Sequence, residues 1–366
     1  MTTRTLKFGV VGCGRISINH LRALASDRVE AQLVAVTDIQ EARARAAAAQ
    51  YHVPSYLDYH EMLKRHPDID VIDILTPTGY HASHVIELAR YGKHFVVEKP
   101  MALRVSDCDQ MIAACRRNGG RLFVVKQNRY NPAVVAARRA LERGRFGKMV
   151  MGTVRVRWKR DQAYYAQDPW RGTWELDGGV IAQQASHHLD LLQWFMGPIS
   201  QVQCRAATRL MDIEVEDTAA ALLTFESGAL GVFEATTATR PRDLEASLSL
   251  LGEGGSVILG GNAVNRVEHW QFEPELPEDE EVRAGASQDV PNVYGHGHVD
   301  YLAAVVRSVL GNQAGLVEGE EGRKNVQILA ALYESAARGG VPVRPGKVRI
   351  RRTRIGRPFP NDARVS

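Results

Sequence analysis

The sequence predicts a mixed α/β protein in which a doubly wound parallel sheet is followed by an α+β domain built on a largely antiparallel, open sheet. Three observations indicate this. A glycine-rich turn separates an apolar run from a helical pattern near the N-terminus, strand-like and helical runs alternate up to about residue 128, and long strands outnumber helices after it. Alternating strands and helices favour a parallel sheet, whereas successive strands favour an antiparallel one. A chain of 366 residues is expected to form two domains.

The glycine-rich turn has the pattern of a dinucleotide-binding site. It lies in the run KFGVVGCGRIS, which begins at Lys7. Gly12 permits the tight turn, and Gly14 lets the backbone approach a pyrophosphate, whose charge is met by free amide groups at the helix N-terminus. Ser17 stands where a third Gly or Ala is usual, and it is still small.

An acidic residue follows the second expected strand. This strand, Gln32 to Thr37, ends in Asp38, at roughly the 20-residue offset at which dinucleotide-binding folds carry an acid. A carboxylate there accepts hydrogen bonds from both hydroxyls of the adenosine ribose but repels a 2′-phosphate, so NAD is expected rather than NADP. The alternative is that Asp38 is a plain helix-capping residue.

The remaining elements of this half complete a parallel sheet. We expect strands over Leu6–Val11, Val71–Leu75, Phe95–Glu98 and Leu122–Lys126, and an alanine-rich helix over Glu41–Gln50. Ligands of such sheets gather at the carboxyl ends of the strands, where the strand order reverses. Those ends carry Gly12 to Arg15, Asp38, Thr76 to His81, Glu98 to Pro100 and Lys126 to Arg129.

The second half is expected to contain one early helix, then strands, then two closing helices. The helices are Pro132–Arg143, Tyr301–Leu310 and Arg323–Ala337, and the strands are Lys148–Lys159, Val202–Ala207, Ala219–Phe225, Ala229–Thr237 and Leu244–Leu251. The first of these strands alternates apolar with largely basic positions, which predicts one buried and one solvated face. The acidic, proline-containing segment Gln271–Asp289 is expected to be a surface loop.

Composition restricts the classes of function. The net charge of +4 is concentrated in residues 344–366, which hold eight Lys or Arg and one Asp, and a solvated tail or an edge strand is preferred there to nucleic-acid binding. No apolar run approaches the length of a membrane span, and no leader precedes the first strand, so a cytoplasmic protein is expected. The four cysteines form no CxxC pair, and Cys108 and Cys115 lie on one helical stripe, which predicts core packing.

Three further stretches carry a resemblance to a known family. They are TPTGYH at 76–81, EKPMAL at 98–103 and DGGVIAQQASHHLDLL at 177–192. With the glycine turn, they resemble the Gfo/Idh/MocA oxidoreductase family over nearly the whole chain, the basic tail excepted. The resemblance implies an NAD-binding Rossmann domain at 1–128, a substrate-binding and oligomerisation domain at 129–343, and a homo-oligomer of two or four chains.

The resemblance also selects two catalytic candidates. Lys99 precedes Pro100 at the end of a strand and, by the EKP signature, would donate to the substrate hydroxyl; without that signature it reads as a surface lysine. The family often has this Lys-Pro bond in the cis form. His187 is expected to be the general base, because oxidation of an alcohol also requires loss of the hydroxyl proton. The residues alone do not distinguish His187 from His188; the family pattern, which continues to Asp190, does.

A departure from the common family pattern points to one branch. Gln183 stands four residues before His187, where many members have Asp, and an amide cannot take a proton. Together with KQNRYNP at 126–132, YYAQDPWRGTWELDGG at 164–179 and EVEDT at 214–218, it resembles bacterial nucleotide-sugar dehydrogenases, whose amide here is Asn. These oxidise the C3 hydroxyl of UDP-N-acetylglucosaminuronic acid for surface polysaccharide, and relatives can reoxidise bound NADH with 2-oxoglutarate.

The site residues expected from position and resemblance form two sets. Cofactor contacts are expected from Gly12, Gly14, Arg15, Ile16, Asp38, Thr76, Pro77, His81, Glu98, Lys99, Gln127, Trp170 and Arg171. Substrate contacts are expected from Lys99, Lys126, Arg129, Asn131, Arg160, Tyr165, Gln183 and His187. No metal is expected, because His296 and His298 are two residues apart with no nearby acid in the sequence.

Three alternative functions stay open. An inositol or other polyol dehydrogenase would more usually carry Asp at position 183. A non-catalytic dinucleotide-sensing regulator would be expected to have lost Lys99 or His187. A nucleic-acid binder would depend on the basic tail, and it is the least favoured of the three.

Overall fold

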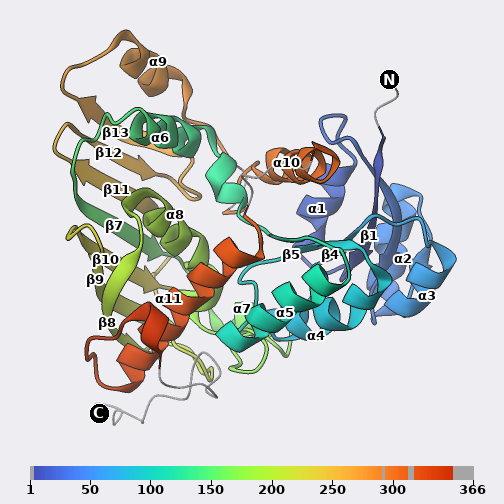
Figure 1. Cartoon of the computed structure of the whole chain (residues 1–366). Helices are drawn as coiled ribbons and strands as arrows, with labels where there is room; N and C mark the ends of the chain where they lie inside the picture. The colour runs from blue at the N-terminus through green and yellow to red at the C-terminus, as the bar shows by residue number, and fades with distance from the viewer. Residues whose placement is uncertain (1–3, 291–292, 312–316, 349–366) are drawn as a thin grey trace. The chain divides into compact units, whose positions relative to one another are not determined.

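The computed structural model describes residues 4–290, 293–311 and 317–348, and they belong to two compact units (Figure 1). The first unit combines Met1–Gln127 with Gly297–Lys324, and the second combines Asn128–His296 with the rest of the chain. The domain boundaries expected from the sequence place residues 297–324 in the second domain, whereas in the structure this segment belongs to the first unit.

The first unit contains a six-stranded parallel sheet. Its strands are β1 (Leu6–Val11), β2 (Ala31–Thr37), β3 (Ser55–Tyr56), β4 (Val71–Ile74), β5 (His94–Val97) and β6 (Leu122–Val124). The strand order is β3-β2-β1-β4-β5-β6, so the order reverses between β1 and β4. This is the Rossmann arrangement, and it confirms the predicted fold class of this half.

Helices follow most of these strands. They are α1 (Ser17–Leu24), α2 (Glu41–Tyr51), α3 (Tyr59–Arg65), α4 (Thr78–Leu88), α5 (Val105–Arg117) and α10 (His298–Gly311). Helix α10 packs beside α1, and α4 packs beside α5 (Figure 1). Cys108 and Cys115 are both buried on α5, which confirms that these cysteines are core residues.

The second unit contains a seven-stranded sheet. Its strands are β7 (Met149–Arg157), β8 (Ile199–Ala207), β9 (Thr218–Phe225), β10 (Leu230–Thr236), β11 (Glu245–Gly252), β12 (Gly255–Gly260) and β13 (Arg266–Phe272). The order is β13-β12-β11-β7-β10-β9-β8, and each pair of neighbours is antiparallel except β7 and β10. The prediction of a largely antiparallel sheet is confirmed.

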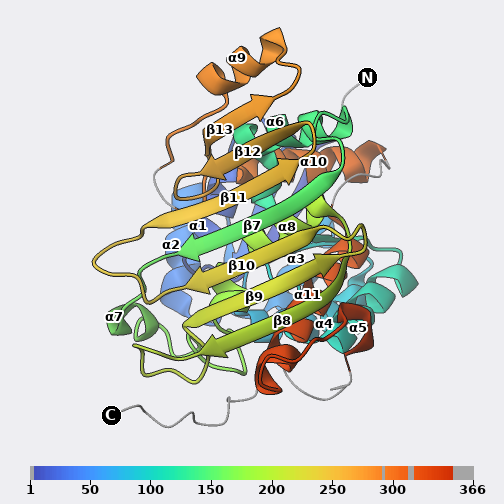
Figure 2. The same ribbon diagram turned by 90° about the vertical axis from the view of Figure 1, so that its left-hand side faces the viewer.

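The helices of this unit favour one face of the sheet. Helix α8 (Ser186–Met196) packs on β7 and β11, and α6 (Pro132–Glu142) packs on β12. The other face is turned to the viewer in Figure 2, and no described helix of this unit crosses it. The short α7 (Gln162–Tyr165) lies in the connection after β7, and α11 (Gly319–Ala337) begins in the first unit and ends in the second.

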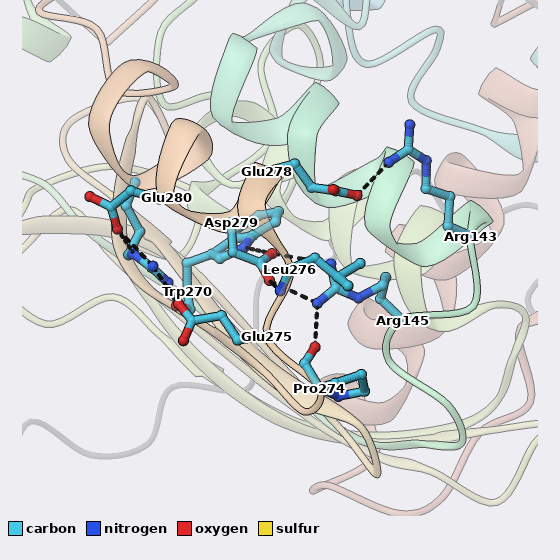
Figure 3. Close-up of polar contacts among 10 residues, drawn as sticks. Arg143, Arg145, Trp270, Pro274, Glu275, Leu276, Glu278, Asp279 and Glu280 are labelled. Carbon is cyan, nitrogen blue, oxygen red and sulfur yellow. Dashed lines mark hydrogen bonds and ion pairs between the residues drawn. The ribbon is translucent and has the colours of Figure 1, made fainter.

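The prediction of a surface loop over Gln271–Asp289 is wrong. This segment contains the end of β13 and the helix α9 (Pro277–Gly285). Pro277 occupies the first turn, and three acidic residues there suit the positive end of the helix dipole. Asp279 anchors the turn, because its Oδ2 accepts from the Leu276 amide at 2.8 Å and its carboxylate pairs with Arg145 (Figure 3).

The basic C-terminal tail and a membrane-spanning helix are the two remaining points of the sequence analysis. Val343 pairs with Val202 of β8 through two backbone hydrogen bonds of 2.9 Å, so the chain reaches the sheet edge just before the basic tail. Most of that tail, 349–366, lies outside the described residues. Among the described helices, none combines the length and apolar character needed to cross a bilayer.

Candidate active site

The glycine turn after β1 has room for a dinucleotide. Gly12 has φ of 101°, and a Cβ atom there would lie 2.9 Å from the carbonyl carbon and oxygen of Leu75, so this position requires glycine. A Cβ atom at Gly14 would meet nothing within 4 Å. No side chain caps the N-terminus of α1 and no acid lies in its first turn. The positive end of this helix therefore fits the pyrophosphate of NAD.

Asp38 connects the end of β2 to this turn. Its Oδ2 accepts from the Cys13 amide at 2.8 Å, and its Oδ1 accepts from the Gln40 amide at 2.7 Å. Each carboxylate oxygen keeps a second lone pair for a ribose hydroxyl. Gln40, not Asp38, is the N-cap residue of α2, so Asp38 is not a plain helix cap.

The turn after β4 is tied to the EKP turn. Pro77 is the N-cap residue of α4, and the buried ring of His81 lies with Nε2 at 2.8 Å from the Thr76 carbonyl oxygen and Nδ1 at 3.1 Å from that of Pro100. Burial lowers the pKa of His81, so the ring is neutral. A neutral ring donates from one nitrogen only, so His81 bonds one of these carbonyl oxygens and lies against the other, between the two turns.

The EKP turn follows β5. The Lys99-Pro100 bond is cis, as the resemblance implied. The Lys99 amide donates to Glu98 Oε2 at 2.9 Å, and Glu98 is buried. At the end of β6, Lys126 and Gln127 are also buried, and Gln127 Oε1 has no hydrogen-bond partner among the described residues.

The sequence interpretation missed a buried cluster beside Glu98. His20 on α1 places Nδ1 2.7 Å from Asp73 Oδ2 and Nε2 3.1 Å from Glu98 Oε1. His298 of α10 lies next to it, with ring centroids 5.2 Å apart. The signal was Asp73, a carboxylate inside the apolar strand VIDI, because a buried carboxylate needs a partner.

This cluster bears on the expectation that no metal is bound. His20, Glu98 and His298 offer ligand atoms within 4.8 Å of one another. The sequence spacing of His296 and His298 did not indicate this set, because its members come from three distant segments. The absence of a metal stays a prediction.

In the second unit, His187 and Gln183 lie on consecutive but different helical segments. His187 is in the first turn of α8 and is 9% exposed, whereas Gln183 belongs to a five-residue π-helical turn, Val180–Gln184. His188 is buried against Trp158, with ring centroids 5.6 Å apart, and so belongs to the core.

The π-helical turn is held by Glu216, another residue that the sequence interpretation missed. Glu216 Oε1 accepts from the Ile181 amide at 3.0 Å and from the Tyr333 hydroxyl at 2.8 Å. A Cβ atom at Gly179 would come within 2.2 Å of the Glu216 carboxyl group, so glycine is required there. The EVEDT motif thus positions the segment that precedes His187.

Two of the expected substrate contacts have structural partners in this unit. Arg129 forms a bidentate pair with Asp190 at 2.8 and 2.9 Å, which neutralises its charge. The Asn131 side-chain amide donates to the Ala263 carbonyl oxygen at 2.7 Å. Both contacts favour a role in positioning the polypeptide.

The other expected contacts of this unit include a cationic cluster. The guanidinium groups of Arg160 and Arg171 lie 5.2 and 4.6 Å from the ring centroid of Tyr164, and Arg171 also lies 4.7 Å from that of Trp170. Arg171 donates to the Tyr164 hydroxyl at 2.8 Å. Arg160 forms an ion pair with Asp243 at 3.3 Å, and Arg171 forms one with Asp168 at 3.2 Å. The neighbouring Tyr165 hydroxyl lies 3.1 Å from Thr237 Oγ1.

Two family models match the chain. Residues 6–126 match the oxidoreductase family with an NAD-binding Rossmann fold, and residues 134–258 match the C-terminal domain of the same family. The chain belongs to the Gfo/Idh/MocA oxidoreductase family. The matches confirm the predicted family, its oxidoreductase class and its NAD-binding domain.

Solved structures and curated relatives narrow the comparison. The WlbA dehydrogenase of Bordetella pertussis, solved with NADH and UDP-GlcNAcA, is 42% identical with a TM-score of 0.89, over 94% of this chain and 99% of that one. WlbA of Chromobacterium violaceum, with the same ligands, is 41% identical with a TM-score of 0.87, over 94% and 97%. D-apiose dehydrogenase of Paraburkholderia graminis is 32% identical over 65% of this chain, and the match spans 62% of that protein's length.

Proposed function

We propose that this protein is an NAD-dependent dehydrogenase that oxidises the C3 hydroxyl of a nucleotide sugar, UDP-N-acetylglucosaminuronic acid, to the 3-keto sugar. The observation that carries the proposal is the similarity to two WlbA dehydrogenases, which are 41% and 42% identical and were solved in complex with NADH and UDP-GlcNAcA. The amide at Gln183 and the presence of both Lys99 and His187 support the same branch.

The proposed chemistry divides between two side chains. His187 takes the proton of the substrate hydroxyl, and the Lys99 ammonium stabilises the negative charge that develops on the oxygen. NAD, when bound, accepts the hydride. Gln183 cannot carry a proton onward from His187, so it serves to orient the imidazole or the substrate.

The charge of the proposed substrate calls for cations. A diphosphate and a carboxylate are best held by planar guanidinium groups or by ammonium groups. Arg160 and Arg171 gather around Tyr164 with Trp170 beside them, and Lys126 lies at the end of β6. We assign the substrate contact to these cations in preference to Arg129, because the bidentate pair of Arg129 with Asp190, at 2.8 and 2.9 Å, is closer than the pairs that Arg160 and Arg171 form with aspartates, at 3.3 and 3.2 Å.

The test is NADH formation by the purified protein, followed by absorbance, with UDP-N-acetylglucosaminuronic acid and with myo-inositol. We expect turnover of the nucleotide sugar, and a loss of about 10²-fold or more in kcat for Lys99→Met and for His187→Asn. His60→Gln is the matched control, because His60 pairs with Glu87 on the surface of the first unit. Unchanged turnover in both site variants would overturn the proposed roles.

An inositol or polyol dehydrogenase is the second candidate. It is favoured by myo-inositol 2-dehydrogenase of Thermotoga maritima, which is 30% identical over 63% of this chain. Preferred turnover of myo-inositol in the same assay would select it. A non-catalytic regulator would bind NAD without reducing it with either compound.

The proposal extends to a homo-oligomer of two or four chains. Leu222 and Leu230 are 60% and 57% exposed on the uncovered face of the second sheet (Figure 2). Leucines this exposed on neighbouring strands favour burial against another protein surface. Light scattering should therefore report a multimer, and Leu222→Glu with Leu230→Glu should weaken it.

The remaining expectations stay predictions. They are reoxidation of the cofactor by 2-oxoglutarate, a role in surface polysaccharide biosynthesis and a cytoplasmic location. The first is tested by adding 2-oxoglutarate after the nucleotide sugar and measuring whether the nicotinamide absorbance falls.

A further inference from the structure

Four buried polar side chains in the first unit have no part in the proposed chemistry. They are His20 of α1, Asp73 of β4, Glu98 after β5 and His298 of α10, each no more than 6% exposed. They come from four separate segments. Buried ionisable groups cost free energy unless they are paired, so their arrangement calls for an explanation.

The contacts of His20 indicate that its ring carries a proton on both nitrogens. A neutral imidazole donates from one nitrogen only, whereas both nitrogens of His20 face carboxylate oxygens, at 2.7 Å from Asp73 and 3.1 Å from Glu98. Burial alone would lower the pKa of His20, but the two carboxylates outweigh it and raise this pKa to about 10. His298 stays neutral, because burial and the His20 charge lower its pKa to about 3.

The second oxygen of Glu98 extends this chain of contacts to the EKP turn. Glu98 Oε2 accepts from the main-chain amide of Lys99 at 2.9 Å. On the other side of the same turn, His81 contacts the Pro100 carbonyl oxygen at 3.1 Å. Glu98 thus fixes the main-chain amide of Lys99, and His81 lies against the carbonyl oxygen of the next residue in the same turn.

We propose that His20 is a positioning residue, an imidazolium whose bond to Glu98 fixes the Lys99 peptide and so directs the Lys99 ammonium to the substrate oxygen. His20 lies on α1, the helix that follows the glycine turn, so its side chain connects this helix to the EKP turn. The inference rests on the proposed function in so far as Lys99 takes part in the reaction.

The charge balance of the cluster agrees with this role. Asp73 and Glu98 bring two carboxyl groups into the interior, and His20 brings one positive charge between them, which opposes the rise that burial causes in the pKa of Asp73. Burial alone would raise the pKa of Glu98, but the hydrogen bond and charge of His20, and then the Lys99 ammonium, lower it to about 2. The other histidines that face Glu98 are His81 and His298, and burial lowers the pKa of both, so they add no charge to the site.

A metal ion is the competing explanation of the cluster. His298 Nε2 has no hydrogen-bond partner among the described residues, and it could ligate an ion together with His20 and Glu98. A ligating His20 nitrogen must be deprotonated. The protonation state of His20 and the metal content of the pure protein therefore separate the two explanations.

The first experiment is independent of activity. Protein labelled with ¹⁵N in its histidines is compared by nuclear magnetic resonance with His20→Gln at pH 8. We expect one histidine that is protonated on both nitrogens in the wild type and absent from the variant. Wild-type protein without such a histidine, or with one equivalent of a metal by mass spectrometry, would overturn the proposal.

The second experiment tests whether His20 acts through Lys99. We expect His20→Gln to lower kcat about tenfold or more, equivalent to the loss of one hydrogen bond, with KM and the NAD dissociation constant within about threefold. His60→Gln is the control, since it removes a carboxylate-paired histidine elsewhere in the same unit. In a Lys99→Met background, the further loss from His20→Gln should nearly vanish.

Three results would change the interpretation of the His20→Gln variant or of the assay. An equal tenfold loss in the Lys99→Met background, or a weakened NAD affinity, means that His20 acts on the cofactor or on folding, and overturns the inference. If His20→Gln does not fold, Glu98→Gln replaces it in the same cycle. If UDP-N-acetylglucosaminuronic acid is not oxidised but myo-inositol is, the proposed function fails, and the same cycle with myo-inositol still decides the role of His20.

Discussion

At the scale of single residues, Gly12 and Gly14 have different reasons to be glycine. Gly12 has positive φ and closely approaches the Leu75 backbone, whereas Gly14 faces open space. We therefore expect Gly12→Ala to destabilise the fold by about 1–3 kcal/mol. Gly14→Ala should leave stability unchanged but weaken NAD binding, because its methyl group would occupy the space for the pyrophosphate.

Thermal unfolding followed by circular dichroism and titration with NAD measure the two effects separately. Gly119→Ala is a control for Gly12→Ala, since Gly119 also has positive φ but a Cβ atom there would meet nothing within 4 Å. If Gly14→Ala binds NAD as the wild type does, the glycine turn does not contact the cofactor.

Residues carried by a motif could be predicted, whereas their buried partners could not. Gly12, Asp38 and Lys99 stand at fixed places relative to strands, so the sequence places them at carboxyl ends. His20 and Glu216 act through contacts with residues distant in the chain. No local pattern encodes such a pair, because tertiary packing alone brings its members together.

At the scale of elements, α9 shows why an acidic segment was misread as a loop. Its charges indicate a solvated segment, but Asp279 is buried and accepts from Arg145, from the Trp270 indole nitrogen and from the Leu276 amide (Figure 3). Glu278, one residue earlier, makes an exposed pair with Arg143. Neighbouring acids in one helix thus have opposite environments, which composition does not distinguish.

This contrast predicts different costs for two adjacent substitutions. Asp279→Ala leaves the part-buried Arg145 without its carboxylate partner and removes the hydrogen bonds that hold the first turn of α9, so it should cost about 3 kcal/mol. Glu278→Ala removes a solvated pair and should cost about 1 kcal/mol or less. Urea unfolding followed by tryptophan fluorescence measures both. Equal effects would mean that the Arg145 network does not stabilise α9.

At the scale of the whole molecule, the parallel sheet was predictable because its strands are short apolar runs between helices. The sequence analysis did not predict the strands β12 and β13. Strand β12 is a short apolar run with Gly255 and Gly260 at its ends, and β13 runs into the acidic segment that was predicted to be a loop. That residues 297–324 belong to the first unit was not predicted either, for another reason. Its helix α10 packs on α1, which lies about 280 residues earlier, and only the folded chain shows that contact.

Stability of the whole second unit should depend on the ionisation of Glu216. Burial raises the pKa of Glu216 to about 7, and the Ile181 amide and the Tyr333 hydroxyl offset it only in part. A carboxyl group whose pKa is higher in the folded than in the unfolded chain stabilises at low pH, and this contribution is lost as pH rises from about 4.5 through 7. Glu216→Gln removes the charge and with it this dependence.

We expect the difference in the free energy of unfolding between Glu216→Gln and the wild type to change with pH. From pH 5 to pH 8, the free energy of unfolding of Glu216→Gln should rise by about 2 kcal/mol relative to wild type. Tryptophan fluorescence in urea reports this unit selectively, because all five tryptophans lie in it. Glu214→Gln is the control, since Glu214 also accepts from a backbone amide, that of Trp174, at 2.9 Å. A pH-independent difference for Glu216→Gln would mean that Glu216 remains charged in the fold, so that the turn before His187 is held by a carboxylate at every working pH.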